Sequence, residues 1–184
     1  RGLALALLCV GVMAPGRSAE IAASGAGCDC AASAPRLGID VLLEQRLDLL
    51  RGKRVGLVTN ATGVDGQLRS SVDRLSAHPG FTLVALFGPE HGVRGDVQAG
   101  DKVASSRDAV TDLPVHSLYG EHREPTAAML AGIDVLVFDI QDVGTRFYTY
   151  PYTLAGVMRA AKRAGIPVVV TDRPDPMGGV RVER

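Results

Sequence analysis

The sequence predicts an α/β fold with a mostly parallel sheet and helices on both of its faces. Two observations carry this prediction. Short, nearly continuous apolar runs such as RVGLVTN (54–60) and DVLVFDI (134–140) are typical of strands buried on both faces. Segments with apolar residues at helical spacing alternate with these runs, as in sheets whose parallel strands are joined by crossover helices. The expected layering is Rossmann-like.

The first elements of the folded part begin near Leu37. Isoleucine and leucine recur at helical spacing over residues 39–50 and Gly52 follows as a stop, which predicts a first helix. The strand at 54–60 comes next. Asp65 is the expected N-cap of a second helix that ends at His78. Its predicted buried face consists of Leu68, Val72 and Leu75.

The second half of the chain continues the alternation. Pro125 and Gly132 bracket a short predicted helix, and a longer helix is expected to open at Pro151 and close at Gly165. The predicted buried face of the longer helix consists of Leu154, Val157, Met158 and Ala161. The remaining predicted strands, in chain order, are 82–87, 114–118, 134–140 and 166–171.

Residues 1–36 have a different composition from the rest. The apolar run 3–14 is too short to span a bilayer and is typical of a secretory signal, and an Ala, Ser and Gly tether follows. Gly25-Ala26-Gly27-Cys28 is similar to a degenerate bacterial lipoprotein box. The position at which a signal peptide would be cleaved is left open. A lipid anchor at Cys28 is a second possibility. We expect a secreted or periplasmic protein with its catalytic domain in residues 37–184.

Composition excludes several classes of function. The 20 Lys and Arg balance the 20 Asp and Glu, and no long run of like charge suggests nucleic acid as a partner. Neither GxGxxG nor GxxxxGK[ST] occurs, so no nucleotide cofactor is expected. The four histidines form no HExxH pattern, and we expect no catalytic metal.

Polar side chains gather where the predicted strands end. In parallel sheets ligands bind beyond the carboxyl ends of the strands, so these loops are expected to form one rim. Asp172 belongs to the loop after the last strand. The other candidates are Asn60 after the first strand, Glu90, His91 and Arg94 after the second, and Asp139, Gln141, Asp142 and Arg146 after the fourth.

Carbohydrate chemistry fits this rim. Splitting a glycosidic bond needs a carboxyl group that stays protonated until it reaches the leaving oxygen, and Glu90 in LFGPEHGVRG is the candidate. In the stretch RFYTYPY, an extended chain would point Arg146, Tyr148 and Tyr150 to one side, where the rings stack on a sugar. Core packing is the alternative role for these tyrosines. Asp139, Asp142 and Asp172 are candidates for a second catalytic group. If the substrate is an N-acetylated sugar, attack by its own acetamido group is the alternative.

Several long motifs resemble those of the exo-β-N-acetylmuramidase (NamZ) family, formerly a domain of unknown function. They are RVGLVTNATGVD, LVALFGPEHGVRGDVQAG, LPVHSLYG, DVLVFDIQDVGTRFYTYPYTL and GIPVVVTDRPDPMGG, in order between residues 37 and 179. The resemblance implies a glycoside hydrolase that releases N-acetylmuramic acid from the non-reducing ends of peptidoglycan fragments. It also implies that Glu90 is the catalytic acid and that Arg94 or Arg146 binds the lactyl carboxylate.

Members of this family continue past the DRPDPMGG motif into a smaller C-terminal domain, which we expect to be missing here. The chain is therefore expected to be a truncated form, of doubtful activity by itself. A muropeptide-binding protein that does not cut its ligand is the alternative function. Hydrolysis of another cell-wall bond with the help of a metal is the third hypothesis.

Overall fold

The computed structural model describes residues 35–95 and 106–178, which belong to one compact unit of the chain. The predicted signal, the tether and the lipid-anchor site at Cys28 lie outside the described residues. None of the helices in the described ranges is long and apolar enough to cross a membrane.

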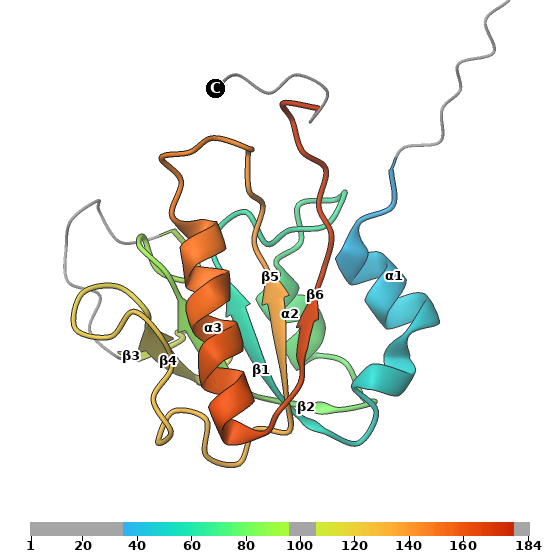
Figure 1. The fold of residues 1–184 in the computed structure, drawn as a ribbon. Helices are drawn as coiled ribbons and strands as arrows, with labels where there is room; N and C mark the ends of the chain where they lie inside the picture. Colours follow the sequence, from blue (N-terminus) through green and yellow to red (C-terminus); the bar gives the residue numbers. More distant parts are fainter. Residues whose placement is uncertain (1–34, 96–105, 179–184) are drawn as a thin grey trace, which may run out of the picture. The chain divides into compact units, whose positions relative to one another are not determined.

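A mostly parallel sheet forms the centre of this unit (Figure 1). Its strand order is β3-β4-β2-β1-β5-β6. Only β3 (Ser106–Arg107), which the sequence did not predict, runs antiparallel to its neighbour among these strands. The five parallel strands are β1 (Arg54–Thr59), β2 (Thr82–Gly88), β4 (Pro114–Ser117), β5 (Val135–Asp139) and β6 (Val168–Val170).

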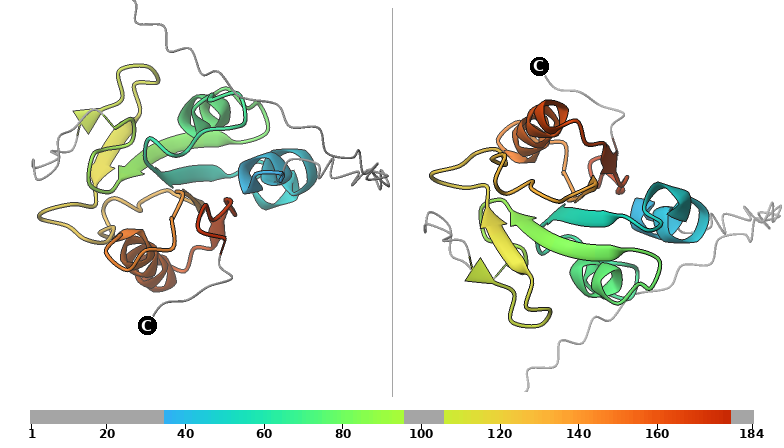
Figure 2. Two further views of the ribbon diagram at one scale, coloured as in Figure 1. Left: turned by 90° about the horizontal axis from the view of Figure 1, so that it is seen from above. Right: turned by 90° about the horizontal axis from the view of Figure 1, so that it is seen from below.

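Helices cover both faces of the sheet, as predicted. The helix α2 (Ser71–Ser76) and the helix α3 (Tyr150–Ala164) lie on opposite sides of it (Figure 2). The helix α1 (Gly38–Gln45) shares the hydrophobic core on the side of α2 and leads into the short 3₁₀ helix η1 (Leu47–Leu49). Alternate residues of the central strands fill the two cores, so β1 and β5 are buried on both faces.

The predicted start of the second helix is wrong. Ser70 is the N-cap of α2, and its hydroxyl accepts a hydrogen bond from the backbone N of Val72 at 3.1 Å. Asp65 instead holds the preceding loop, because its Oδ1 accepts from the backbone N of both Gln67 and Arg69 at 2.9 Å. Leu68 is consequently 80% exposed and lies outside the core.

Two further predictions differ from the structure. Residues 127–132 form turns and no helix, although Leu130 does reach the core. In α3, Leu154, Val157 and Ala161 pack into the core as predicted, while Met158 is 53% exposed. Gly165 ends this helix with a left-handed backbone, as the sequence predicted.

The strand order places a topological switch point between β1 and β5. From β1 the chain adds β2 and β4 on one side, and then crosses over to add β5 and β6 on the other. Ligands of open α/β sheets bind beyond the carboxyl ends of the strands at such a point. The loops that follow β1, β2, β4, β5 and β6 therefore frame the candidate site.

Candidate active site

The loop after β2 carries Glu90 to the carboxyl edge of the sheet. Gly88 is paired with Ser117 of β4, and the backbone N of Leu118 donates to the Gly88 carbonyl at 2.8 Å. Glu90 and Tyr119 each follow this pair by two residues, so the register of the two strands sets them side by side. His91 has a positive φ of 73°, which is uncommon outside glycine and marks a tightly constrained turn.

Glu90 lines a cavity of about 400 Å³, called here the Glu90 cavity. The Tyr119 hydroxyl donates a hydrogen bond to the Glu90 carboxylate, and this bond raises the pKa of Tyr119 above its ordinary value of 10.0. Tyr119 consequently stays protonated and remains a donor at neutral pH. The lining residues are Pro89, Glu90, Leu118, Tyr119, Arg123, Thr149, Tyr152, Thr153 and Arg159.

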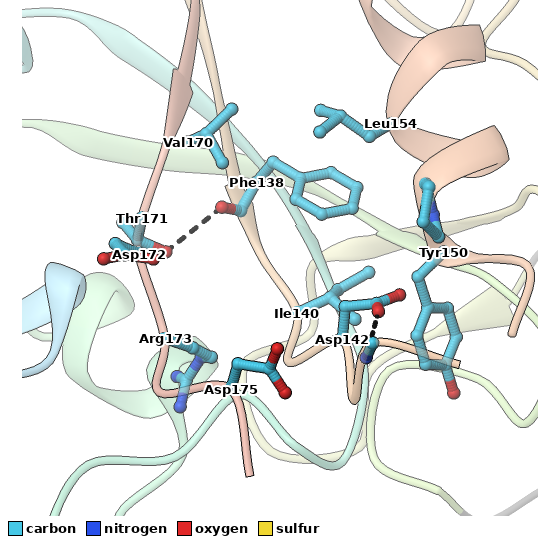
Figure 3. A pocket seen from close by; sticks show the side chains of 12 residues that line it. Phe138, Ile140, Asp142, Tyr150, Leu154, Val170, Thr171, Asp172, Arg173 and Asp175 are labelled. Atoms are coloured by element: carbon cyan, nitrogen blue, oxygen red, sulfur yellow. Dashed lines mark hydrogen bonds between the residues drawn. The ribbon is translucent and has the colours of Figure 1, made fainter. Parts of the chain in front are cut away.

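A second cavity, of about 330 Å³, lies between β5, β6 and α3 and is called here the Asp142 cavity (Figure 3). Its apolar end is formed by Phe138, Leu154 and Val170, and its polar end by Asp142, Asp172, Arg173 and Asp175. Asp142 Oδ1 accepts from the backbone N of Gly144 at 2.8 Å, whereas its Oδ2 is buried without a hydrogen-bond partner among the described residues. Asp142 therefore keeps an unused hydrogen-bond acceptor at the polar end of this cavity.

Tyr150 connects the two cavities electrostatically. Burial raises the pKa of its hydroxyl, and the neighbouring Tyr148, Glu90 and Asp142 raise it further. A hydrogen bond from the Asn60 amide to the Tyr150 hydroxyl lowers this pKa. Because the carboxylates of Glu90 and Asp142 both raise the pKa of Tyr150, the two residues lie near the same phenol at one edge of the sheet.

The aromatic stretch around Tyr148 is arranged differently from the prediction. Residues 146 and 147 form a turn, closed by the backbone N of Tyr148 donating to the Thr145 carbonyl at 3.1 Å, so the segment is not extended. The rings of Phe147 and Tyr148 are 5.7 Å apart, and those of Tyr148 and Tyr150 are 5.6 Å apart. The first pair meets edge to face and the second is tilted, and together they form an aromatic cluster of which Tyr150 lines the Asp142 cavity and Phe147 is 81% exposed.

Asn60 and Gln141 join the loops around the site. Asn60 Oδ1 accepts from the backbone N of Thr62 at 3.0 Å and from its hydroxyl at 2.6 Å. The same hydroxyl accepts from the backbone N of Gln141 at 2.9 Å, and Gln141 Nε2 donates to the Pro174 carbonyl at 2.9 Å. This chain of hydrogen bonds fixes the loops after β1, β5 and β6 relative to one another.

Asp139 lies beneath the site in a buried ion pair. Its side chain is 0% exposed, and Arg173, 5% exposed, donates to both carboxylate oxygens at 2.7 Å. Thr171 donates to Oδ1 at 2.6 Å, and the Ser71 hydroxyl donates to Oδ2. Both oxygens are therefore occupied, which favours a framework role over the catalytic role that the sequence suggested.

Arg94 is also engaged by other side chains of the protein. Its Nε and Nη2 donate to Asp108 at 2.5 and 2.9 Å, and Nη2 also donates to Asp73 at 2.8 Å. These contacts raise the pKa of Arg94, and the pKa of Asp108 is held well below its ordinary value, chiefly by the bond from Arg94. With two carboxylates already bound, Arg94 is poorly placed to take a substrate carboxylate.

The structure thus brings Glu90, Asp142 and Tyr150 to the cavities, places Tyr148 next to Tyr150, and places Asn60 and Gln141 in the framework around them. His91 lies in the turn beside Glu90, and Arg146 is exposed on the turn after β5. Sequence reasoning missed Tyr119 and Arg123. The signal for Tyr119 was its position just after a predicted strand, parallel to that of Glu90.

Among residues 35–95 and 106–178, no three His, Cys, Asp or Glu side chains are grouped so that they could hold a metal ion. The chemistry available at this edge is that of carboxyl groups, phenols and guanidinium groups. Such a set can donate a proton, stack on a ring and bind an anion.

Comparison with known proteins gives consistent matches. The N-terminal model of the family described as exo-beta-N-acetylmuramidase NamZ matches residues 55–183. The chain is 59% identical over 146 residues to the peptidoglycan beta-N-acetylmuramidase NamZ of Bacillus subtilis (strain 168). That alignment covers 79% of this chain and 35% of the relative.

Two solved structures of DUF1343 family proteins from Bacteroides fragilis also match. One has a TM-score of 0.73 and 52% identity and covers 80% of this chain and 36% of that protein. The other has a TM-score of 0.63 and 33% identity and covers 77% and 35%. The chain spans about a third of the length of the relatives it matches.

Proposed function

The chain belongs to the exo-beta-N-acetylmuramidase NamZ family, and on this premise we propose that the Glu90 cavity is where the glycosidic bond of a terminal N-acetylmuramic acid is hydrolysed. The substrates proposed are peptidoglycan fragments with this sugar at the non-reducing end. One observation carries the proposal: a glutamate, held by a tyrosine hydroxyl, lines a cavity at the carboxyl edge of the sheet.

Glu90 is the proposed proton donor to the leaving oxygen. Glycoside hydrolysis also uses a second group, which activates water, attacks the sugar or orients the acetamido group of the substrate. Asp142 is the proposed second group, because its Oδ2 has no partner among the described residues and because both it and Glu90 act on Tyr150. Asp172 is exposed and also lines the Asp142 cavity, but it is not among the groups that raise the pKa of Tyr150.

The aromatic residues are proposed to hold the sugar. Tyr152 lines the Glu90 cavity and is 73% exposed, while Tyr150 lines the Asp142 cavity and its ring lies 5.6 Å from that of Tyr148. A pyranose presents an apolar face that packs on such rings. Stacking leaves the hydroxyl groups of the sugar free to bond with the polar side chains around it.

The proposed place of action is outside the cytoplasm, in the periplasm or after secretion. The apolar run at 3–14 and the tether after it motivate this proposal, with Cys28 as the candidate lipid-anchor site. Fractionation of the producing bacterium tests it, and recovery of the protein from the cytosol with an intact N-terminus would contradict it.

A chromogenic β-glycoside of N-acetylmuramic acid tests the function on the purified full-length protein. The parent protein is expected to release the chromophore, and Glu90→Gln to lower turnover by about 10²- to 10⁴-fold, as for loss of a general acid. Asp142→Asn is expected to lower turnover as well. Glu121→Gln is the matched control, because this carboxylate is 90% exposed and lies outside the Glu90 cavity.

The thermal midpoints of these variants should stay close to that of the parent. Turnover by Glu90→Gln near the parent's rate would remove Glu90 from the acid role. Saturable binding of the glycoside by the parent protein without release would instead support a binding protein.

A further inference from the structure

The Glu90 cavity has a cationic side chain that the sequence analysis did not single out. Arg123 lines this cavity together with Glu90 and Tyr119. Within the described part of the chain, no hydrogen bond or ion pair engages the Arg123 guanidinium. Arg123 therefore brings an unmatched positive charge to the cavity that holds the candidate acid.

Three other arginines near the carboxyl edge are paired. Arg94 binds Asp108 and Asp73, and Arg173 binds Asp139. Arg159 also lines the Glu90 cavity, but its Nε lies 3.3 Å from Glu124. Arg146 lies on the turn after β5 and is exposed, as Arg123 is, but it does not line the Glu90 cavity.

The backbone at Arg123 is held close to α3. A Cβ added to Gly156 of α3 would lie 3.0 Å from the Arg123 carbonyl oxygen and 3.2 Å from Glu124 Cβ, so glycine is what allows this close approach. Arg163 and Arg159 of α3 bind Glu124 at 2.6 and 3.3 Å. Arg123 is thus carried by a segment that its neighbours fix beside the cavity.

We propose that Arg123 binds a carboxylate of the substrate and makes the site selective for an acidic sugar. The inference rests on the proposed function, in which the Glu90 cavity holds the terminal sugar. N-acetylmuramic acid carries a carboxylate on its lactyl ether, and N-acetylglucosamine has no such group. A guanidinium binds a carboxylate through two parallel hydrogen bonds, which a neutral ester cannot match.

Calorimetric titration of the full-length protein with N-acetylmuramic acid and with its methyl ester tests this role. The two sugars differ in charge and hardly in shape. The parent protein is expected to bind the acid about tenfold or more tightly than the ester, the scale of a charged hydrogen bond. Arg123→Gln should weaken binding of the acid and leave binding of the ester unchanged, so that the two affinities differ by no more than about twofold. Arg123→Lys should restore part of the preference for the acid.

Two control variants are informative. Arg107→Gln makes the same chemical change at an exposed arginine paired with Asp112, outside the site, and should keep the full preference. Arg146→Gln tests the rival arginine on the neighbouring turn. Loss of the preference in Arg146→Gln with its retention in Arg123→Gln would overturn the proposal.

The failure of this inference can be told apart from the failure of the proposed function. If the parent releases chromophore from the muramic acid glycoside and prefers the acid, while Arg123→Gln keeps that preference, the function stands and the inference is wrong. If the parent neither releases chromophore nor binds either sugar, both are wrong.

Discussion

The charged side chains at the carboxyl edge of the sheet fall into two groups. Asp139 with Arg173 and Arg94 with Asp108 are matched pairs whose hydrogen-bonding groups are used inside the protein. Glu90 and Asp142 instead line cavities. The first group holds loops in place, and the second borders the cavities in which a ligand can bind.

The hydrogen bond from Tyr119 to Glu90 makes a prediction about turnover. The Tyr119 hydroxyl donates to the Glu90 carboxylate and helps to hold it in position in the cavity. Tyr119→Phe should therefore lower kcat by about tenfold, the scale of one hydrogen bond to a charged group, while KM changes little.

Separate measurement of kcat and KM for the parent and Tyr119→Phe checks this expectation. The charged and titratable groups around Glu90 are Tyr119, Arg123, Tyr150, Tyr152, Arg159 and His91, and only Tyr119 is changed in the variant. An unchanged kcat would show that the Tyr119 hydroxyl does not position Glu90.

The buried pair of Asp139 and Arg173 makes a prediction about stability. Asp139→Asn leaves the Arg173 charge buried without its counter-ion, and breaking a buried pair in this way costs about 3–5 kcal/mol of unfolding free energy. Urea unfolding measures the loss. Asp112→Asn, at the exposed pair with Arg107, should unfold like the parent.

The opposite result would revive the catalytic assignment of Asp139. A variant that unfolds at the parent's urea concentration but has lost turnover would place Asp139 in the reaction. The structure favours loss of stability, because four hydrogen bonds already occupy the two oxygens.

At the scale of elements, the loops at the carboxyl edge are bound to each other and to α1. The hydrogen bonds of Thr62 and Gln141 connect the loops after β1, β5 and β6. The backbone N of Gly38, in the first turn of α1, donates to the Asp172 carbonyl at 2.7 Å. The helix α1 thus supports the loop that carries Asp172 and Arg173.

Gly38→Ala tests this contact. An added Cβ would lie 2.2 Å from the backbone N of Asp172, and backbone there cannot move aside without shifting the loop. The expected loss of unfolding free energy is about 1–3 kcal/mol, the usual cost of overpacking, as measured by urea unfolding.

Gly66→Ala is the matched control for Gly38→Ala. A Cβ at Gly66 meets nothing within 4 Å, so this variant should be as stable as the parent or slightly more stable. Equal stability of the two variants would show that α1 and the Asp172 loop are not tightly packed.

At the scale of the whole molecule, two hydrophobic cores hold the sheet between α1 and α2 on one side and α3 on the other. The cores and the sheet form a rigid base, and the residues proposed to act on a ligand lie in loops at one edge of it. Open α/β sheets bind their ligands at this edge. The proposed reaction at that edge uses carboxyl groups.

The reaction proposed for the molecule predicts no effect of metal removal. Treatment with a chelator followed by dialysis should leave the release of chromophore within about twofold of the untreated protein, because a carboxyl group supplies the acid. Loss of activity that is restored by adding a divalent cation would favour the metal-dependent hypothesis.

Much of the fold could be predicted from the sequence, because burial on both faces leaves a local pattern. The structure confirms the runs predicted for β1, β2, β4 and β5 to within one residue at each end. Turns and caps were less predictable, since Asp65 can either cap a helix or close a loop with its own backbone neighbours. In the structure Asp65 closes the loop, and Ser70 caps the helix.

The sequence by itself determined that Glu90 follows a buried strand and that polar loops gather at one edge of the sheet. Only the tertiary structure decided which of these charges face a cavity. Asp139 and Asp142 are three residues apart and equivalent as sequence, yet Arg173, 34 positions away, neutralises only the first. Charge pairing depends on contacts between distant segments, and a pattern of neighbouring residues carries no information about them.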